Sequence, residues 1–132
     1  VLRAYTAVRK DAPMPNYMLL LHADEKAGQA LPKEVMAQWM DKMHAYKQAL
    51  DKAGAHIGHG ALGASTSASI VNLDKDGEMQ VHNGPFADTK EQLGGYYLIR
   101  ASDLAAAQKW AAQCPGALWG HIEIRQVTDS AD

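Results

Sequence analysis

Residues 33–53, "KEVMAQWMDKMHAYKQALDKA", carry the clearest helical periodicity in the chain. Their apolar side chains recur every three or four residues, which places them along one face of an amphipathic helix. Pro32 suits the first turn of this helix, and Gly54 suits its end. The apolar face consists of Met36, Trp39, Met40, Met43, Tyr46, Leu50 and Ala53. Such a face is buried against another layer, so the flanking segments decide the fold.

Segments of strand type flank this helix on both sides. We expect strands at 16–23, 65–73, 78–83, 96–101 and 121–127, and a glycine-broken strand or loop at 55–62. "DKDG", 74–77, predicts the turn of a hairpin, and 24–32 reads as a loop. A second helix is expected at 103–114, capped by Ser102 and ended by Pro115 and Gly116.

This order predicts an α+β fold: a ferredoxin-like βαββαβ arrangement with an extra hairpin. Both helices are expected on one face of the sheet. The other face then stays uncovered, and a chain this small often buries such a face against a second copy of itself. The sequence therefore predicts a homodimer.

The 132 residues fit a single domain, which we place at 16–132 after a leader or arm at 1–15. A net charge of −2, with the basic residues scattered, gives no reason to expect nucleic acid or a membrane as a partner. The single cysteine, Cys114, excludes an internal disulfide and is expected to be buried. No apolar run resembles a signal peptide or a membrane span, so a cytoplasmic setting is expected.

Histidines supply the main candidates for chemistry. His44 lies on the flank of the helix stripe, and Asp51 shares that flank about 10 Å away, too far for direct contact. His22 ends the first strand, where it either lines a pocket mouth or is a hydrogen-bonded core residue. His56 and His59 are expected on opposite faces of a strand. The spacing of these residues predicts no metal site and no cofactor.

Two further strands present polar faces. His121, Glu123 and Arg125 share one face of the last strand. Arg100 shares a face with Tyr96 and Leu98. Such residues can bind a polar ligand, or they can satisfy one another across strands or across a dimer.

The stretch "NGPFADTKEQLGG", 83–95, is rich in turn residues. Gly84 and Pro85 predict a rigid turn, and Phe86, the only phenylalanine, is expected as an anchor in the core. Loop capping and salt bridges are the expected roles of Asp88, Lys90 and Glu91, with catalysis as the alternative. Gly94 and Gly95 indicate a bulge or a close backbone approach.

The longer stretch "VHNGPFADTKEQLGGYYLIRASDLAAAQKWAAQCPGALWGHIEIRQV", 81–127, resembles the YCII-related family in its DGPF-domain branch. That branch is named for an Asp-Gly-Pro-Phe run. The matching residues here are Gly84, Pro85, Phe86, Asp88, Thr89, Lys90, Glu91, Gly94, Gly95, Cys114, Pro115, Gly120, Glu123 and Arg125. The resemblance covers roughly 16–127. Asn83 replaces the name-giving Asp, and Gln126 stands where the family usually has Pro.

The resemblance implies a ferredoxin-like fold of the dimeric α/β-barrel type and, usually, a homodimer. The biochemical role of the family is mostly unassigned. Relatives outside the DGPF branch resemble enzymes with a His–Asp dyad whose His lies in the first helix; the nearest residues here are His44 and Asp51. DGPF members are also often encoded beside extracytoplasmic-function sigma factors, which implies a regulatory or stress setting.

Two functional hypotheses follow. In the first, the protein binds a small molecule between helix 33–53 and the sheet and has weak acid–base activity. His44 is then the acid or base, and His22 with Arg100 or Arg125 orients an anionic or phenolic substrate. In the second, it is a non-catalytic dimeric accessory protein linked to a sigma factor. The residues that fix its fold and interface are then Asp88, Lys90, Glu91, Glu123 and Arg125.

Overall fold

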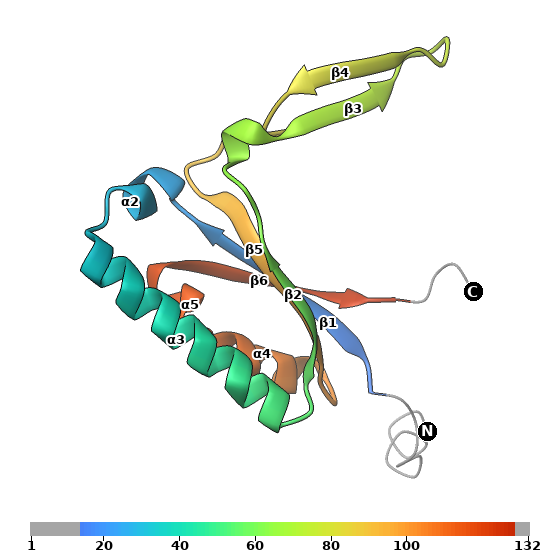
Figure 1. Ribbon diagram of the computed structural model, residues 1–132. Coiled ribbons are helices and arrows are strands. Elements are labelled where there is room, and N and C mark those ends of the chain that lie inside the picture. The colour runs from blue at the N-terminus through green and yellow to red at the C-terminus, as the bar shows by residue number, and fades with distance from the viewer. Residues whose placement is uncertain (1–13, 129–132) are drawn as a thin grey trace, which may run out of the picture.

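A computed structural model describes residues 14–128, so the arm predicted for 1–15 lies outside the described residues except for its last two positions. The main sheet has four strands in the order β2-β5-β1-β6 (Figure 1). All neighbouring strands in it are antiparallel. Their bounds are β1 Asn16–Ala23, β2 His56–Ala61, β5 Gln92–Arg100 and β6 Gly120–Val127.

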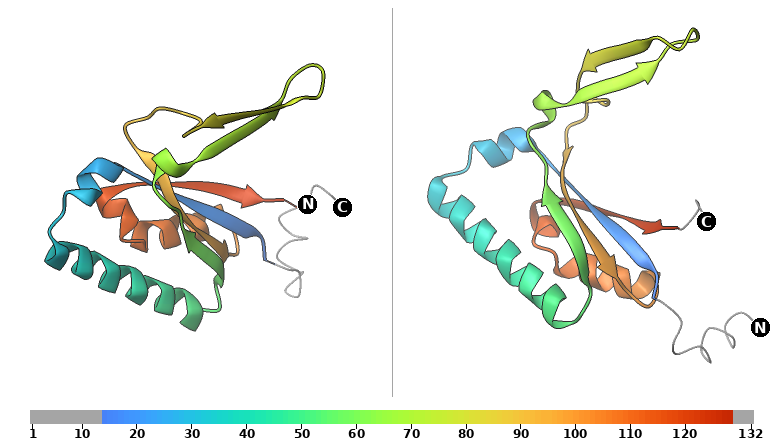
Figure 2. Two further views of the ribbon diagram at one scale, coloured as in Figure 1. Left: turned by 45° about the horizontal axis from the view of Figure 1, so that its top comes forward. Right: turned by 45° about the vertical axis from the view of Figure 1, so that its right-hand side comes forward.

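The two long helices, α3 (Lys33–Lys52) and α4 (Leu104–Gln113), lie on one face of this sheet (Figure 1). Two short helices, α2 (Glu25–Gln29) and α5 (Gly116–Trp119), lie at its connections. β3 (Ser69–Leu73) and β4 (Met79–Asn83) form a separate two-stranded hairpin that projects from the main sheet (Figure 2). The predicted α+β, ferredoxin-like arrangement with an extra hairpin is therefore confirmed. Over residues 14–128 the sheet is open and forms no closed barrel.

The core lies between the sheet and the C-terminal half of α3. Tyr17 and Leu19 alternate toward the helices from β1, and Ile99 does so from β5. Leu50 of α3 is completely buried against them. Burial of these side chains is the main stabilising contribution to the fold.

The N-terminal half of α3 is not covered in the same way. Of the predicted stripe, Tyr46 and Leu50 are buried, whereas Met36 and Met40 remain 37% and 50% exposed. Two hollows lie beside these methionines, between α3 and the sheet. The periodicity therefore predicted the helix correctly, but only part of its apolar face belongs to the core.

Three local predictions were wrong, two of them because short capping interactions were not foreseen. The expected loop at 24–32 contains α2, since the Asp24 carboxylate accepts a hydrogen bond from the Ala27 amide. Asp103, rather than Ser102, caps α4 by accepting from the Ala106 amide at 2.8 Å. The expected strand at 65–73 begins only at residue 69, after a short turn of 3₁₀ helix.

Phe86 is not a core anchor. Its side chain is 87% exposed, because the turn that carries it lies at the base of the projecting hairpin (Figure 1). Gly84 itself fits closely there: its amide donates to the Ala68 carbonyl at 2.7 Å, and an added Cβ would meet Ile70 at 3.0 Å. The turn is thus built as expected, but it presents its aromatic residue to solvent.

Candidate functional site

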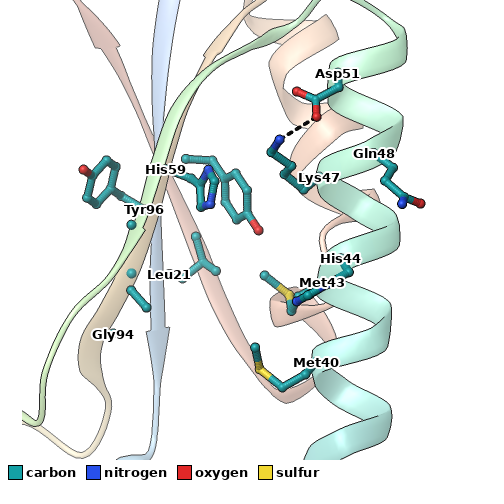
Figure 3. Close-up of a pocket in the computed structure, with 14 residues that line it drawn as sticks. Leu21, Met40, Met43, His44, Lys47, Gln48, Asp51, His59, Gly94 and Tyr96 are labelled. Carbon is teal, nitrogen blue, oxygen red and sulfur yellow. Dashed lines mark hydrogen bonds and ion pairs between the residues drawn. The ribbon is translucent and has the colours of Figure 1, made fainter.

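A cleft with a volume of about 750 Å³ lies between α3 and the edge of the sheet formed by β2 and β5 (Figure 3). Lys47 and Asp51 extend into it from α3, and His59 lies opposite them on β2. Met40 and Met43 form an apolar wall on the helix side. The volume is in the range of small-molecule sites, and the apolar lining with few polar groups is typical of them.

A continuous set of polar contacts runs along one end of this cleft. Lys47 Nζ donates to Asp51 Oδ2 at 2.7 Å. Asp51 Oδ1 lies 3.4 Å from His56 Nδ1, which is an ion-pair distance. His56 Nε2 and His59 Nδ1 are 2.9 Å apart, so they share one hydrogen bond. We call Asp51, His56 and His59 the polar relay.

The relay corrects the expectation that His56 and His59 point to opposite faces. Their strand contains one extra residue: His56 pairs with Ile99, but Gly58 already pairs with Leu98. This bulge shifts the alternation by one position, so both imidazoles lie on the helix side of the sheet. A glycine within a strand is a sequence signal for such a bulge.

The electrostatics of the relay favour a charged carboxylate. The hydrogen bond from Lys47 lowers the pKa of Asp51, and the positive charge of Lys47 lowers it further. Asp51 Oδ1 and His56 Nδ1 are in ion-pair contact at 3.4 Å and form no hydrogen bond. In the tautomer that places the His56 proton on Nδ1, toward the carboxylate, His56 Nε2 accepts from His59 Nδ1 and His59 Nε2 keeps a lone pair.

Tyr97 of β5 supports the last histidine. Its ring stacks on His59, with centroids 5.5 Å apart and an interplanar angle of 20°. Burial raises the pKa of Tyr97, so its phenol stays neutral at physiological pH. The stack limits rotation of the imidazole.

His44 and Asp51, the expected acid–base pair, both line the cleft. His44 is solvent-exposed on α3, and within residues 14–128 no hydrogen bond or ion pair joins it to Asp51. The Asp51 carboxylate instead contacts Lys47 and His56. Sequence reasoning thus identified the cleft and its carboxylate, but it missed the two histidines that the carboxylate approaches.

The remaining candidates lie on the opposite, open face of the sheet. His22 Nε2 is 3.0 Å from Glu123 Oε1, and Arg125 Nη1 donates to Glu123 Oε2 at 3.4 Å. Arg100 lies on that face too. It is two positions from Leu98, which pairs with Met18 on the open face, and residues two apart on a strand point to the same side. The structure therefore does not bring His22, Arg100 or Arg125 to His44.

His22 instead adjoins a second hollow, of about 580 Å³, beneath the turn at 83–86. Pro85, Phe86 and Glu91 also line it. Glu91 Oε1 lies 2.8 Å from His121 Nδ1, whereas Asp88 and Lys90 are exposed. The two carboxylates that contact these histidines, Glu123 and Glu91, are therefore already paired within the protein.

Among residues 14–128, no group of three or more metal-ligating side chains is placed to hold a metal ion. In the same part of the chain, no helix combines the length and the apolar character needed to cross a membrane.

The chain is similar to a known domain family and to a known bacterial protein. The model of the YCII-related domain family matches residues 16–131. An uncharacterized protein of Rhizobium meliloti (strain 1021) is 35% identical over 113 residues, which cover 84% of this chain and 90% of the relative.

Proposed function

This chain belongs to the YCII-related domain family, and we propose that it binds a small molecule in the cleft beneath α3 and transfers a proton to or from it. The polar relay is the observation that carries this proposal. It links a carboxylate to two imidazoles and ends at an imidazole that lines the cleft.

In the proposed mechanism, His59 is the acid or base. Its Nε2 lone pair accepts a proton from the bound molecule, and the resulting positive charge is shared with His56 through their common hydrogen bond. Asp51 stabilises that charge without becoming protonated, as a carboxylate does behind a catalytic histidine. His44, at the rim, is not required for this step.

The cleft favours a ligand rich in hydrogen-bond acceptors. Among residues 14–128, Asp51 is the only carboxylate that lines it, and both Asp51 oxygens are already in contact with a cation or an imidazole. The Lys47 ammonium has three N–H donors; one is bonded to Asp51, and two remain for a ligand. The surplus of donors suits a carboxylate, phenolate or carbonyl oxygen, which refines the expected anionic or phenolic substrate.

The binding step is tested by thermal shift with a panel of carboxylates and phenols. A panel member that binds the native state raises the melting temperature. Lys47→Met and His59→Phe should remove the shift, whereas His44→Ala should keep most of it. A shift that survives the first two variants, or that only His44→Ala removes, contradicts the proposal.

The chemical step is tested separately by deuterium exchange. A 2-oxo acid that binds should exchange its C3 protons with D2O faster in the presence of the protein, followed by NMR. We expect a rate at least about tenfold above the protein-free rate, which is modest for general base catalysis. An exchange rate that is the same for wild type and His59→Phe would show that His59 is not the base.

We also propose that the chain is a DGPF-branch member and forms a homodimer. Asn83 ends β4 and Gly84 is tightly enclosed, so the first role of the turn is structural. The open face of the sheet carries Met18, Leu20 and Leu98, and no helix within residues 14–128 covers it. Sedimentation velocity of the full chain measures the dimer directly; a monomer at all accessible concentrations would reject it.

The projecting hairpin favours a second candidate function, that of a non-catalytic accessory protein linked to a sigma factor. Val71 faces Val81 and Leu73 faces Met79 across it, and each is more than half exposed. Such a surface is typical of protein contacts. The test is a pull-down with the full chain and with Val71→Ser/Val81→Ser; recovery of a sigma factor by the first alone would support this candidate, and recovery by neither would remove it.

A further inference from the structure

The cleft of the proposed site does not end at Met40 but continues along α3 toward its N-terminus. A second hollow, of about 370 Å³, begins where the first stops, and both are lined by Met40, Met43 and Gly94. The two hollows therefore adjoin at these three residues, which we call the waist. We call the part beyond the waist the apolar extension.

The apolar extension offers almost no free polar group. Its walls are formed mainly by Leu31, Met36, Trp39 and Trp119. The rings of Trp39 and Trp119 stack face to face, with centroids 3.9 Å apart, and connect α3 to α5. These side chains form an apolar, partly open surface that the core of the protein does not use.

The few polar residues in the apolar extension are engaged within the protein. The Asp24 carboxylate caps α2. Glu25 accepts from the amide and the hydroxyl of Ser65 at 2.8 and 2.7 Å. The Gln92 side chain accepts from the Glu25 amide and donates to a backbone carbonyl. A ligand that reached this end would meet mainly apolar contacts, and the indole N–H groups of Trp39 and Trp119 are the main donors there.

One of the waist residues is a glycine that the fold does not require. Gly95 is required by packing, since an added Cβ would lie 2.9 Å from the Gly60 carbonyl oxygen. At Gly94 an added Cβ would meet nothing within 4 Å, and the residue has no positive φ. Neither packing nor backbone conformation demands a glycine at 94. Gly94 lines both hollows, and a side chain added there would meet open space.

From this geometry we infer that the ligand of the proposed site is amphipathic, with an anionic or phenolic head at Lys47 and His59 and an elongated apolar tail in the apolar extension. The inference rests on the proposed function for the head. The tail has independent support: the two hollows adjoin, the polar groups of the second are mostly engaged, and the N-terminal half of α3 is uncovered. From Met36 to Asp51 the helix rises about 20 Å, which is room for a long unbranched chain or for linked rings.

The experiment is calorimetric titration of the full chain with three probes. Hexanoate and dodecanoate share a carboxylate and differ in tail length, and dodecyltrimethylammonium has the long tail with a cationic head. Dodecanoate should bind at least about tenfold more tightly than hexanoate, because each buried methylene adds to the affinity. It should also bind more tightly than the cationic probe.

Gly94→Leu fills the waist, and Gly94→Ala serves as its matched control with little added volume. The leucine variant should lose the advantage of dodecanoate over hexanoate, measured as the ratio of the two affinities, whereas the alanine variant should keep most of that ratio. Circular dichroism melts confirm that the two variants fold. The inference is overturned if tail length has no effect, or if Gly94→Leu leaves the affinity ratio unchanged.

The same titrations separate this inference from the proposed function. If Lys47→Met weakens hexanoate but no tail advantage exists, the head site stands and the apolar extension is refuted. If dodecanoate binding depends on Gly94 but not on Lys47 or His59, the apolar extension stands and the proposed function is refuted.

Discussion

The hydroxyl of Tyr46 is the most informative single group to remove from the core. It donates to the Trp110 carbonyl at 2.7 Å. That carbonyl lies in the last turn of α4. Its usual helical partner would be the Cys114 amide, but this amide donates to the Ala111 carbonyl. Tyr46 therefore caps an otherwise unpaired helix carbonyl and ties α3 to α4. Tyr46→Phe keeps the ring but leaves the carbonyl half-buried without its partner.

We expect Tyr46→Phe to lower the free energy of unfolding by about 1–2 kcal/mol, the usual effect of leaving one acceptor unsatisfied. That change corresponds to a melting temperature lower by about 3–8 °C for a domain of this size. Urea denaturation followed by circular dichroism measures it. Tyr96→Phe is the matched control, since within residues 14–128 the Tyr96 hydroxyl makes no hydrogen bond; its effect should stay below about 0.5 kcal/mol.

The same variant makes a prediction about alkaline pH. Burial raises the pKa of Tyr46 far above its usual value, so the folded state retains a proton that the unfolded state loses above about pH 10. The stability linked to Tyr46 is complete below that pH and falls as the pH rises, by up to about 1.4 kcal/mol per pH unit. Tyr97 is shifted in the same direction by burial.

Wild type should therefore lose stability more steeply between pH 10 and 11 than Tyr46→Phe does. Urea denaturation at these two pH values gives both slopes. Equal slopes, or an unfolding free energy unchanged by the mutation at neutral pH, would refute the reasoning about the buried hydroxyl.

Three smaller changes test other parts of the structure. Gly95→Ala should destabilise the fold by about 1–3 kcal/mol, because its Cβ would lie 2.9 Å from a backbone carbonyl, whereas Gly94→Ala should change the melting temperature little; equal effects would contradict the assigned roles. Asp103→Ala should cost about 1 kcal/mol through loss of the α4 cap, and Ser102→Ala about nothing, in urea denaturation. Phe86→Ser should leave the unfolding free energy within about 0.5 kcal/mol, since the side chain is 87% exposed; a larger loss would restore it to the core.

The regular elements could be predicted because their signals are local. The three- and four-residue spacing in α3 and the alternation in β6 each follow from the geometry of one element. The ferredoxin-like order followed from their sequence along the chain. The burial of individual side chains was predicted wrongly. Phe86 and Met40 are apolar, but the positions of the hairpin and of α3 relative to the sheet leave them exposed. Those positions depend on contacts between distant segments.

The site was predictable only in part for the same reason. The cleft beneath α3, with His44 and Asp51 on its wall, follows from which helix face is polar. The relay depends on the side of the sheet that His56 and His59 occupy, which a bulge reverses. Gly58 signals that a bulge is present, but only the pairing with β5 shows where the extra residue lies.

The bulge in β2 decides on which side of the sheet His59 lies. Because one additional residue separates it from His56 on the strand, its imidazole lies beneath α3 instead of on the open face. If the strand paired in regular alternation from His56, with no bulge, His59 would point to the far side of the sheet. All the functional groups would survive such a change of pairing, yet the carboxylate and the final imidazole would be separated by the thickness of the sheet. The relay therefore depends on the residue that stays out of the pairing as well as on the side chains that form it.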